Sequence, residues 1–88
     1  MKKINKNIIK PLIEKYNLNV KDHWTTEHVY PGNKIFTCYY YVFVLNGHEY
    51  CVSGDSESYV FSTTVSILYM GYSLSDLEKA IKNIAQAS

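Results

Sequence analysis

A metal site could be imagined from two of the histidines, His23 and His28, together with the two cysteines, Cys38 and Cys51. His23 and His28 are separated by four residues, a spacing that also occurs between the histidines of zinc fingers. Cys38 and Cys51, however, fall on different predicted strands and lack the Cys-x2-Cys spacing of a zinc knuckle. We therefore expect no metal site, and no other motif calls for a cofactor.

Nucleophilic or phosphate-directed chemistry has an equally weak basis. A reactive cysteine needs a neighbouring base and some exposure, whereas the strand pattern directs Cys38 and Cys51 toward the predicted core. The sequence Gly54-Asp55-Ser56 lacks the second glycine and the lysine of a phosphate-binding loop. Helix capping by Asp55 or Ser56 explains this segment without chemistry, so we predict that the chain is not an enzyme.

The strongest structural signal is a hairpin centred on Asn46-Gly47, which separates two runs of β-branched and aromatic residues. Both positions of a type I′ turn need positive φ angles, and Asn-Gly is the preferred pair. A two-residue turn fixes the register of the strands on either side. The predicted cross-strand pairs are Val44 with Glu49, Phe43 with Tyr50, Val42 with Cys51 and Tyr41 with Val52.

Hydrophobic periodicity predicts the remaining elements. An N-terminal helix is expected over about residues 7–17, and a strand over 20–30 returns through the turn 31–33, with Tyr30 opposite Lys34, into a strand over 35–45. After the strand 48–54, we expect one helix from Asp55 or Ser56 to Gly71 and a final helix capped by Ser73. The predicted fold is α+β: an N-terminal helix, a three-stranded antiparallel meander and two C-terminal helices, in a single domain of residues 1–88.

The two faces of this meander differ in predicted role. Alternation places Trp24, Phe36, Cys38, Tyr40, Val42, Val44 and Cys51 on one face, which we take as the core. The opposite face is rich in aromatic residues, and its predicted partner-binding residues are Tyr39, Tyr41, Phe43, His48 and Tyr50. The pattern leaves open whether a helix covers that second face instead.

The charge distribution is uneven, although the net charge is only +1. Residues 1–34 carry seven lysines against three acids, and the chain has no arginine. Arginine supplies the planar fork used in base-specific readout, so its absence disfavours sequence-specific DNA recognition. If the chain binds nucleic acid, the expected contacts are Lys3, Lys6, Lys10 and Lys21.

Helix, three-stranded meander and helix is also the element order of the double-stranded-RNA-binding domain. The stretch Pro31-Gly32-Asn33-Lys34-Ile35-Phe36, with the long strand and Asn46-Gly47 that follow it, resembles the middle of that family. The resemblance implies its topology and an RNA-binding alternative. At the start of the closing helix, however, the family is basic, whereas this chain has Gly54-Asp55-Ser56-Glu57-Ser58, whose acids would repel phosphates.

The same arrangement, with the segment Asn46-Gly47-His48-Glu49-Tyr50-Cys51-Val52-Ser53, is similar to that of certain small phage anti-CRISPR proteins. This resemblance implies a non-catalytic inhibitor that docks on a host protein, above all a CRISPR effector nuclease. The Lys-, Asn- and Ile-rich composition is typical of AT-rich bacterial or phage genomes. No membrane span or signal peptide is evident, so we expect a cytoplasmic protein of the host cell. A homodimeric interaction module is a further alternative for the function.

Overall fold

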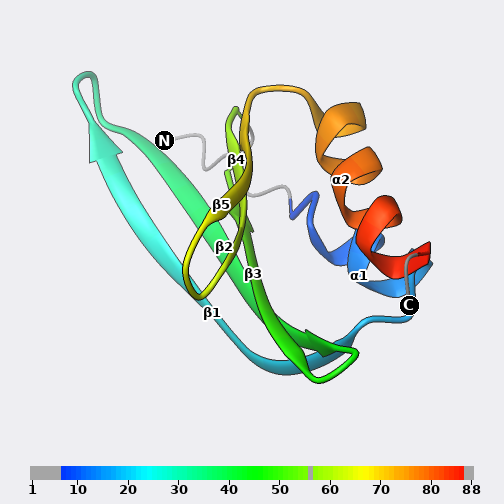
Figure 1. Cartoon of the computed structure of the whole chain (residues 1–88). Helices are drawn as coiled ribbons and strands as arrows, with labels where there is room; N and C mark the ends of the chain where they lie inside the picture. Colours follow the sequence, from blue (N-terminus) through cyan, green and yellow to red (C-terminus); the bar gives the residue numbers. More distant parts are fainter. Residues whose placement is uncertain (1–6, 56, 87–88) are drawn as a thin grey trace.

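The computed structural model describes residues 7–55 and 57–86, which form one antiparallel sheet with two helices (Figure 1). The elements in chain order are α1 (Lys10–Lys15), β1 (Asn19–Tyr30), β2 (Lys34–Leu45), β3 (His48–Gly54), β4 (Tyr59–Thr63), β5 (Ile67–Gly71) and α2 (Leu74–Gln86). The strands follow one another across the sheet in the order β1-β2-β3-β4-β5. Both helices lie on the same side of the sheet (Figure 1).

The prediction of three strands and two C-terminal helices is therefore wrong, because a fourth and a fifth strand replace the first of those helices. Asp55 does not cap a helix: its Oδ1 accepts hydrogen bonds from the backbone N–H groups of Glu57 and Ser58, and its own N–H donates to the Ser58 carbonyl. This tight turn sends the chain back along β3. Thr63 Oγ1 accepts from the N–H groups of Val65 and Ser66 and shapes the turn into β5.

The two predicted hairpins are confirmed. In the second, Asn46 and Gly47 have φ angles of 55° and 77°, as a type I′ turn requires. The pairing of β2 with β3 has the predicted register, including Phe43 opposite Tyr50. In the first hairpin, Tyr30 pairs with Lys34 as expected, and β1 and β2 run together over twelve residues each.

Helix α1 is shorter than the sequence pattern indicates, because Pro11 restricts it to the segment beginning at Lys10. Asn7 Oδ1 accepts hydrogen bonds from the N–H groups of Ile9 and Lys10 just before the first turn. The helix ends at Lys15. Beyond the cap residue Tyr16, Asn17 has a left-handed φ of 50°, and Leu18 N–H donates to the Ile13 carbonyl. This is the hydrogen-bond pattern of a Schellman cap.

The core lies between the helices and the sheet and consists of Ile9, Leu12, Ile13, Leu18, Phe43, Val52, Tyr59, Phe61, Leu77 and Ile81. Rings of Phe43, Tyr50 and Phe61 stack side by side over β2, β3 and β4 with centroids 5.6 to 6.0 Å apart. The helices thus cover the face that carries Phe43, which is the opposite of the predicted core face.

A β-bulge in β1 places Val20 and Trp24 on opposite faces of the sheet. The pairing of β1 with β2 shifts between Val20, opposite Phe43, and Asp22, opposite Val42. The extra residue, Lys21, reverses the alternation of side chains along the strand. Val20 therefore packs against the core, while Trp24, which simple alternation places on the same side as Val20, lies opposite Tyr40 on the other face.

Candidate functional site

The predicted partner-binding residues lie on the helix-covered side of the sheet. Phe43 is fully buried, and Tyr41 and Tyr50 are partly buried against the core. Tyr41 Oη accepts a hydrogen bond of 2.7 Å from Asn7 Nδ2. Tyr39 is half-buried and His48 is exposed beside the second turn. Of the five predicted partner-binding residues, Phe43 therefore belongs to the core and His48 is exposed.

The opposite face carries no described helix, and we call it the helix-free face (Figure 1). The strand register places on it Trp24, Thr26, His28, Tyr30, Phe36, Cys38, Tyr40, Val42, Val44, Cys51, Val60 and Met70. The water-exposed face of an antiparallel sheet normally carries polar side chains, whereas apolar and aromatic side chains dominate the helix-free face. Exposed apolar patches are typical of interaction sites, so this face is the candidate site.

Aromatic pairs run along the part of this face formed by β1 and β2. The rings of Trp24 and Tyr40 stack with centroids 5.1 Å apart and an interplanar angle of 9°. Tyr30 and Phe36 meet edge to face at 5.0 Å near the end of the hairpin. Trp24 is 43% exposed and Tyr30 is 46% exposed, so large aromatic surfaces remain open to a partner.

Charged groups on the helix-free face are few and lie toward its two ends. Lys34 begins β2 at the tip of the first hairpin. At the other end, Asp22 and Glu49 flank β2 opposite Val42 and Val44, and Lys21 Nζ is 3.0 Å from Glu49 Oε2. One end thus carries one positive charge, and the other carries two negative charges against one positive. Between them, after burial, the nearby charge of Asp55 is a further cause that raises the pKa of the Cys38 thiol.

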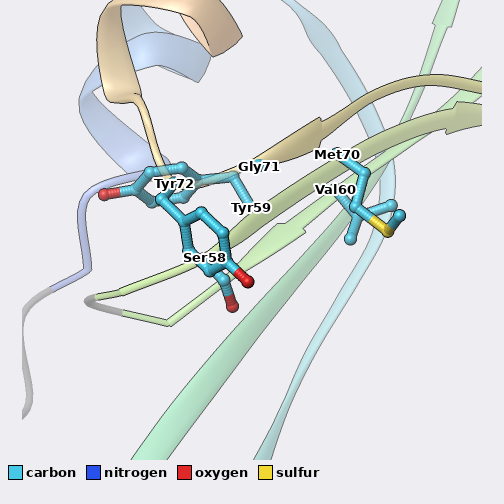
Figure 2. A pocket seen from close by; sticks show the side chains of 6 residues that line it. All are labelled: Ser58, Tyr59, Val60, Met70, Gly71 and Tyr72. Carbon is cyan, nitrogen blue, oxygen red and sulfur yellow. The ribbon is translucent and has the colours of Figure 1, made fainter.

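A shallow pocket of about 340 Å³ adjoins the edge of this face formed by β4 and β5 (Figure 2). It is lined by Ser58, Tyr59, Val60, Met70, Gly71 and Tyr72. Val60 and Met70 are cross-strand partners, and Figure 2 shows their side chains next to each other. Met70 is 68% exposed, and no charged group lines the pocket, so it suits an apolar side chain of a partner.

Both cysteines are half-buried on the helix-free face and are free thiols. Burial is the main cause that raises the pKa of the Cys38 thiol, and it also raises the pKa of Cys51. A raised thiol pKa keeps the sulfur protonated at neutral pH and makes it a poor nucleophile. These two residues therefore contribute apolar surface to the face.

The lysines predicted as nucleic-acid contacts are not gathered into one patch by the structure. Lys3 and Lys6 lie outside the described residues. Lys10 is exposed on α1, on the helix side of the sheet, whereas Lys21 reaches Glu49 on the helix-free side.

Within residues 7–55 and 57–86, no group of three or more His, Cys, Asp or Glu side chains could hold a metal ion. No helix in this part of the chain is long and apolar enough to cross a membrane. The chain matches no protein-family model, no curated protein and no solved structure, so its function must be argued from the site.

Proposed function

We propose that this chain is a non-catalytic protein-binding domain that docks on its partner through the helix-free face. One observation carries the proposal: the helices close only one side of the sheet, and the other side keeps stacked, half-exposed aromatic rings. Tryptophan and tyrosine are the residues that most often dominate binding energy at protein interfaces. In this proposal Trp24, Tyr40 and Met70 take the role first given to Tyr41, Phe43 and Tyr50.

A protein partner fits this face better than a nucleic acid. Proteins that bind single-stranded nucleic acid on a sheet combine stacking aromatics with a basic groove for the phosphates. Here the middle of the face has no lysine, and Lys21, one of the two cations at its ends, is already paired with Glu49. RNA or DNA binding remains the second candidate, and it predicts a steep loss of affinity with added salt.

Docking without chemistry is sufficient to inhibit another protein. The resemblance to small anti-CRISPR proteins rests on the predicted order of elements, of which the N-terminal helix and the hairpin at Asn46-Gly47 remain in the five-stranded fold. On that basis, a host CRISPR effector nuclease is the partner that we propose to test first. The chain would act by covering a functional surface of that nuclease. A nearly neutral net charge of +1 favours shape and apolar contact over mimicry of DNA charge.

The test combines capture with face variants. The tagged chain is used to capture effectors from lysate of a low-GC bacterium that expresses them, with nuclease treatment in one arm, and purified effectors are then assayed for DNA cleavage. Trp24→Ser and Met70→Ser should abolish capture and inhibition. Val65→Ser is the matched control, because Val65 is 90% exposed in the turn between β4 and β5.

Loss of every partner after nuclease treatment would move the assignment to nucleic-acid binding. Full capture and inhibition by folded Trp24→Ser and Met70→Ser variants would show that the helix-free face is not the docking surface.

A further inference from the structure

We infer that a second copy of this chain occupies the helix-free face in the free protein, so that two sheets pack face to face as an antiparallel dimer. This inference rests on the proposed function, since it takes the same face as the docking surface and names its first occupant. Three properties of the face carry it: its apolar area, the separation of its end charges and its central aromatic pair.

The area is sufficient for a stable pair. The five strands contain 12, 12, 7, 5 and 5 residues. With a rise of about 3.3 Å per residue and a strand spacing of about 4.8 Å, the face covers roughly 650 Å². Two copies would bury about 1,300 Å², within the range of about 1,200–2,000 Å² found for stable protein interfaces.

The end charges select a second copy in one orientation. Consider a two-fold axis that lies between the two sheets, passes over β2 near Tyr40 and is perpendicular to the strands. The β2 strands of the two copies then lie one above the other and run antiparallel. Lys34 of each copy then lies over the end of the other copy that carries Asp22 and Glu49. The positive end meets the end with a net negative charge twice, once at each end of the dimer.

The centre of such a dimer would be aromatic. The stacked pair Trp24 and Tyr40 lies near the proposed axis, so it meets the same pair of the second copy. The positions around this pair on β1, β2 and β3 carry no charge and are occupied by Thr26, Cys38, Val42 and Cys51. This arrangement has the apolar centre and charged rim of a protein interface. Because both occupants need the same face, a host partner competes with dimer formation.

Sedimentation velocity across a dilution series tests the inference. The unmodified chain should sediment as a dimer at about 100 µM and dissociate on dilution, as expected for an interface of standard size. Lys34→Glu places like charges at both ends and should weaken the dimer at least about fivefold. The double variant Lys34→Glu with Asp22→Lys exchanges the two signs and should restore dimerisation.

Lys79→Glu is the matched control, because Lys79 is exposed on α2 and its substitution changes the net charge by the same amount. It should leave the dimer unchanged. An unmodified chain that stays monomeric throughout the series overturns the inference, as does a double variant no tighter than Lys34→Glu. Neither result decides the proposed function. The capture of effectors with the Trp24→Ser and Met70→Ser variants tests that function separately.

Discussion

Phe43 and Trp24 lie on opposite faces of the same sheet and separate its closed side from its open side. Phe43 has no exposed surface and stacks against Tyr50 and Phe61. Trp24 stacks only on Tyr40 and keeps nearly half of its surface exposed. Their substitutions should therefore affect different properties of the protein.

Phe43→Ala should lower the free energy of unfolding by about 3–5 kcal/mol, because it leaves a cavity in the core. Trp24→Ala should lower it by less than about 2 kcal/mol, since the ring is only partly removed from water. Urea denaturation followed by circular dichroism measures both under conditions where the chain is monomeric. A larger loss for Trp24→Ala than for Phe43→Ala would contradict the assignment of the faces.

The thiols of Cys38 and Cys51 should react slowly with iodoacetamide at neutral pH, because burial raises the pKa of both. Unfolding in denaturant should accelerate the reaction to the rate of an ordinary cysteine. Mass spectrometry of samples quenched over time measures this rate. Rapid alkylation in the folded protein would show that one of the thiols is more accessible or more acidic than the structure indicates.

At the scale of the elements, the sequence predicts those parts whose geometry is set by local chemistry. Asn46-Gly47 specifies both the turn and the register of β2 with β3, and Ser73 caps α2 by accepting a hydrogen bond from the Asp76 N–H. Residues 59–71 were misassigned because a short apolar run has similar spacing in a strand and in a helix. Their β-branched residues, and the turn-forming side chains of Asp55 and Thr63, are the signals that favour a hairpin.

Gly47→Ala should destabilise the second hairpin by about 1 kcal/mol, because its φ of 77° is left-handed and an alanine there is strained. Nothing lies within 4 Å of the position that an added Cβ would take, so the effect should be conformational alone. Thermal unfolding measures the loss. Unchanged stability would mean that the turn can adopt another type without cost.

Glu78 joins the two helices, since its carboxylate accepts hydrogen bonds from Lys15 Nζ on α1 and from Tyr16 Oη. The hydrogen bond from Lys15, and next that from Tyr16, lower the pKa of Glu78. A lowered folded-state pKa stabilises the protein above the unfolded value near 4.5 and loses this contribution as the pH falls through the folded-state value. The hydrogen bond to Glu78 also raises the pKa of Lys15 and of Tyr16, so their contributions disappear as the pH rises through their folded-state pKa values.

Glu78→Gln should therefore reduce the stability at neutral pH, and the difference from the unmodified chain should shrink as the pH falls through the lowered folded-state pKa and the carboxylate becomes protonated. Urea denaturation at several pH values measures this difference. Glu14→Gln is the matched control, because Glu14 is exposed on α1. An equal loss of stability at neutral and at acidic pH would show that the carboxylate charge is not what joins the helices.

At the scale of the whole molecule, the sequence does not reveal which face of the sheet the helices cover. That choice depends on the packing of Ile9, Leu12, Leu77 and Ile81, which are far in sequence from the central strand β2. The predicted contact residues followed the wrong choice and lie largely beneath the helices. The sequence groups Trp24, Tyr40 and Cys51 on one face correctly, but it does not show that this face is the one without helices.

The most direct test of the docking surface uses Trp24, the only tryptophan in the chain. Replacing it with fluorotryptophan gives one ¹⁹F resonance on the helix-free face, with no signal from an unlabelled partner. We predict that saturation with a captured effector shifts this resonance and shields it from water. The reference is the free protein diluted until it is monomeric, because a dimer would itself cover Trp24. A complex that forms while the resonance and its exposure to water stay those of this monomer would contradict the central claim.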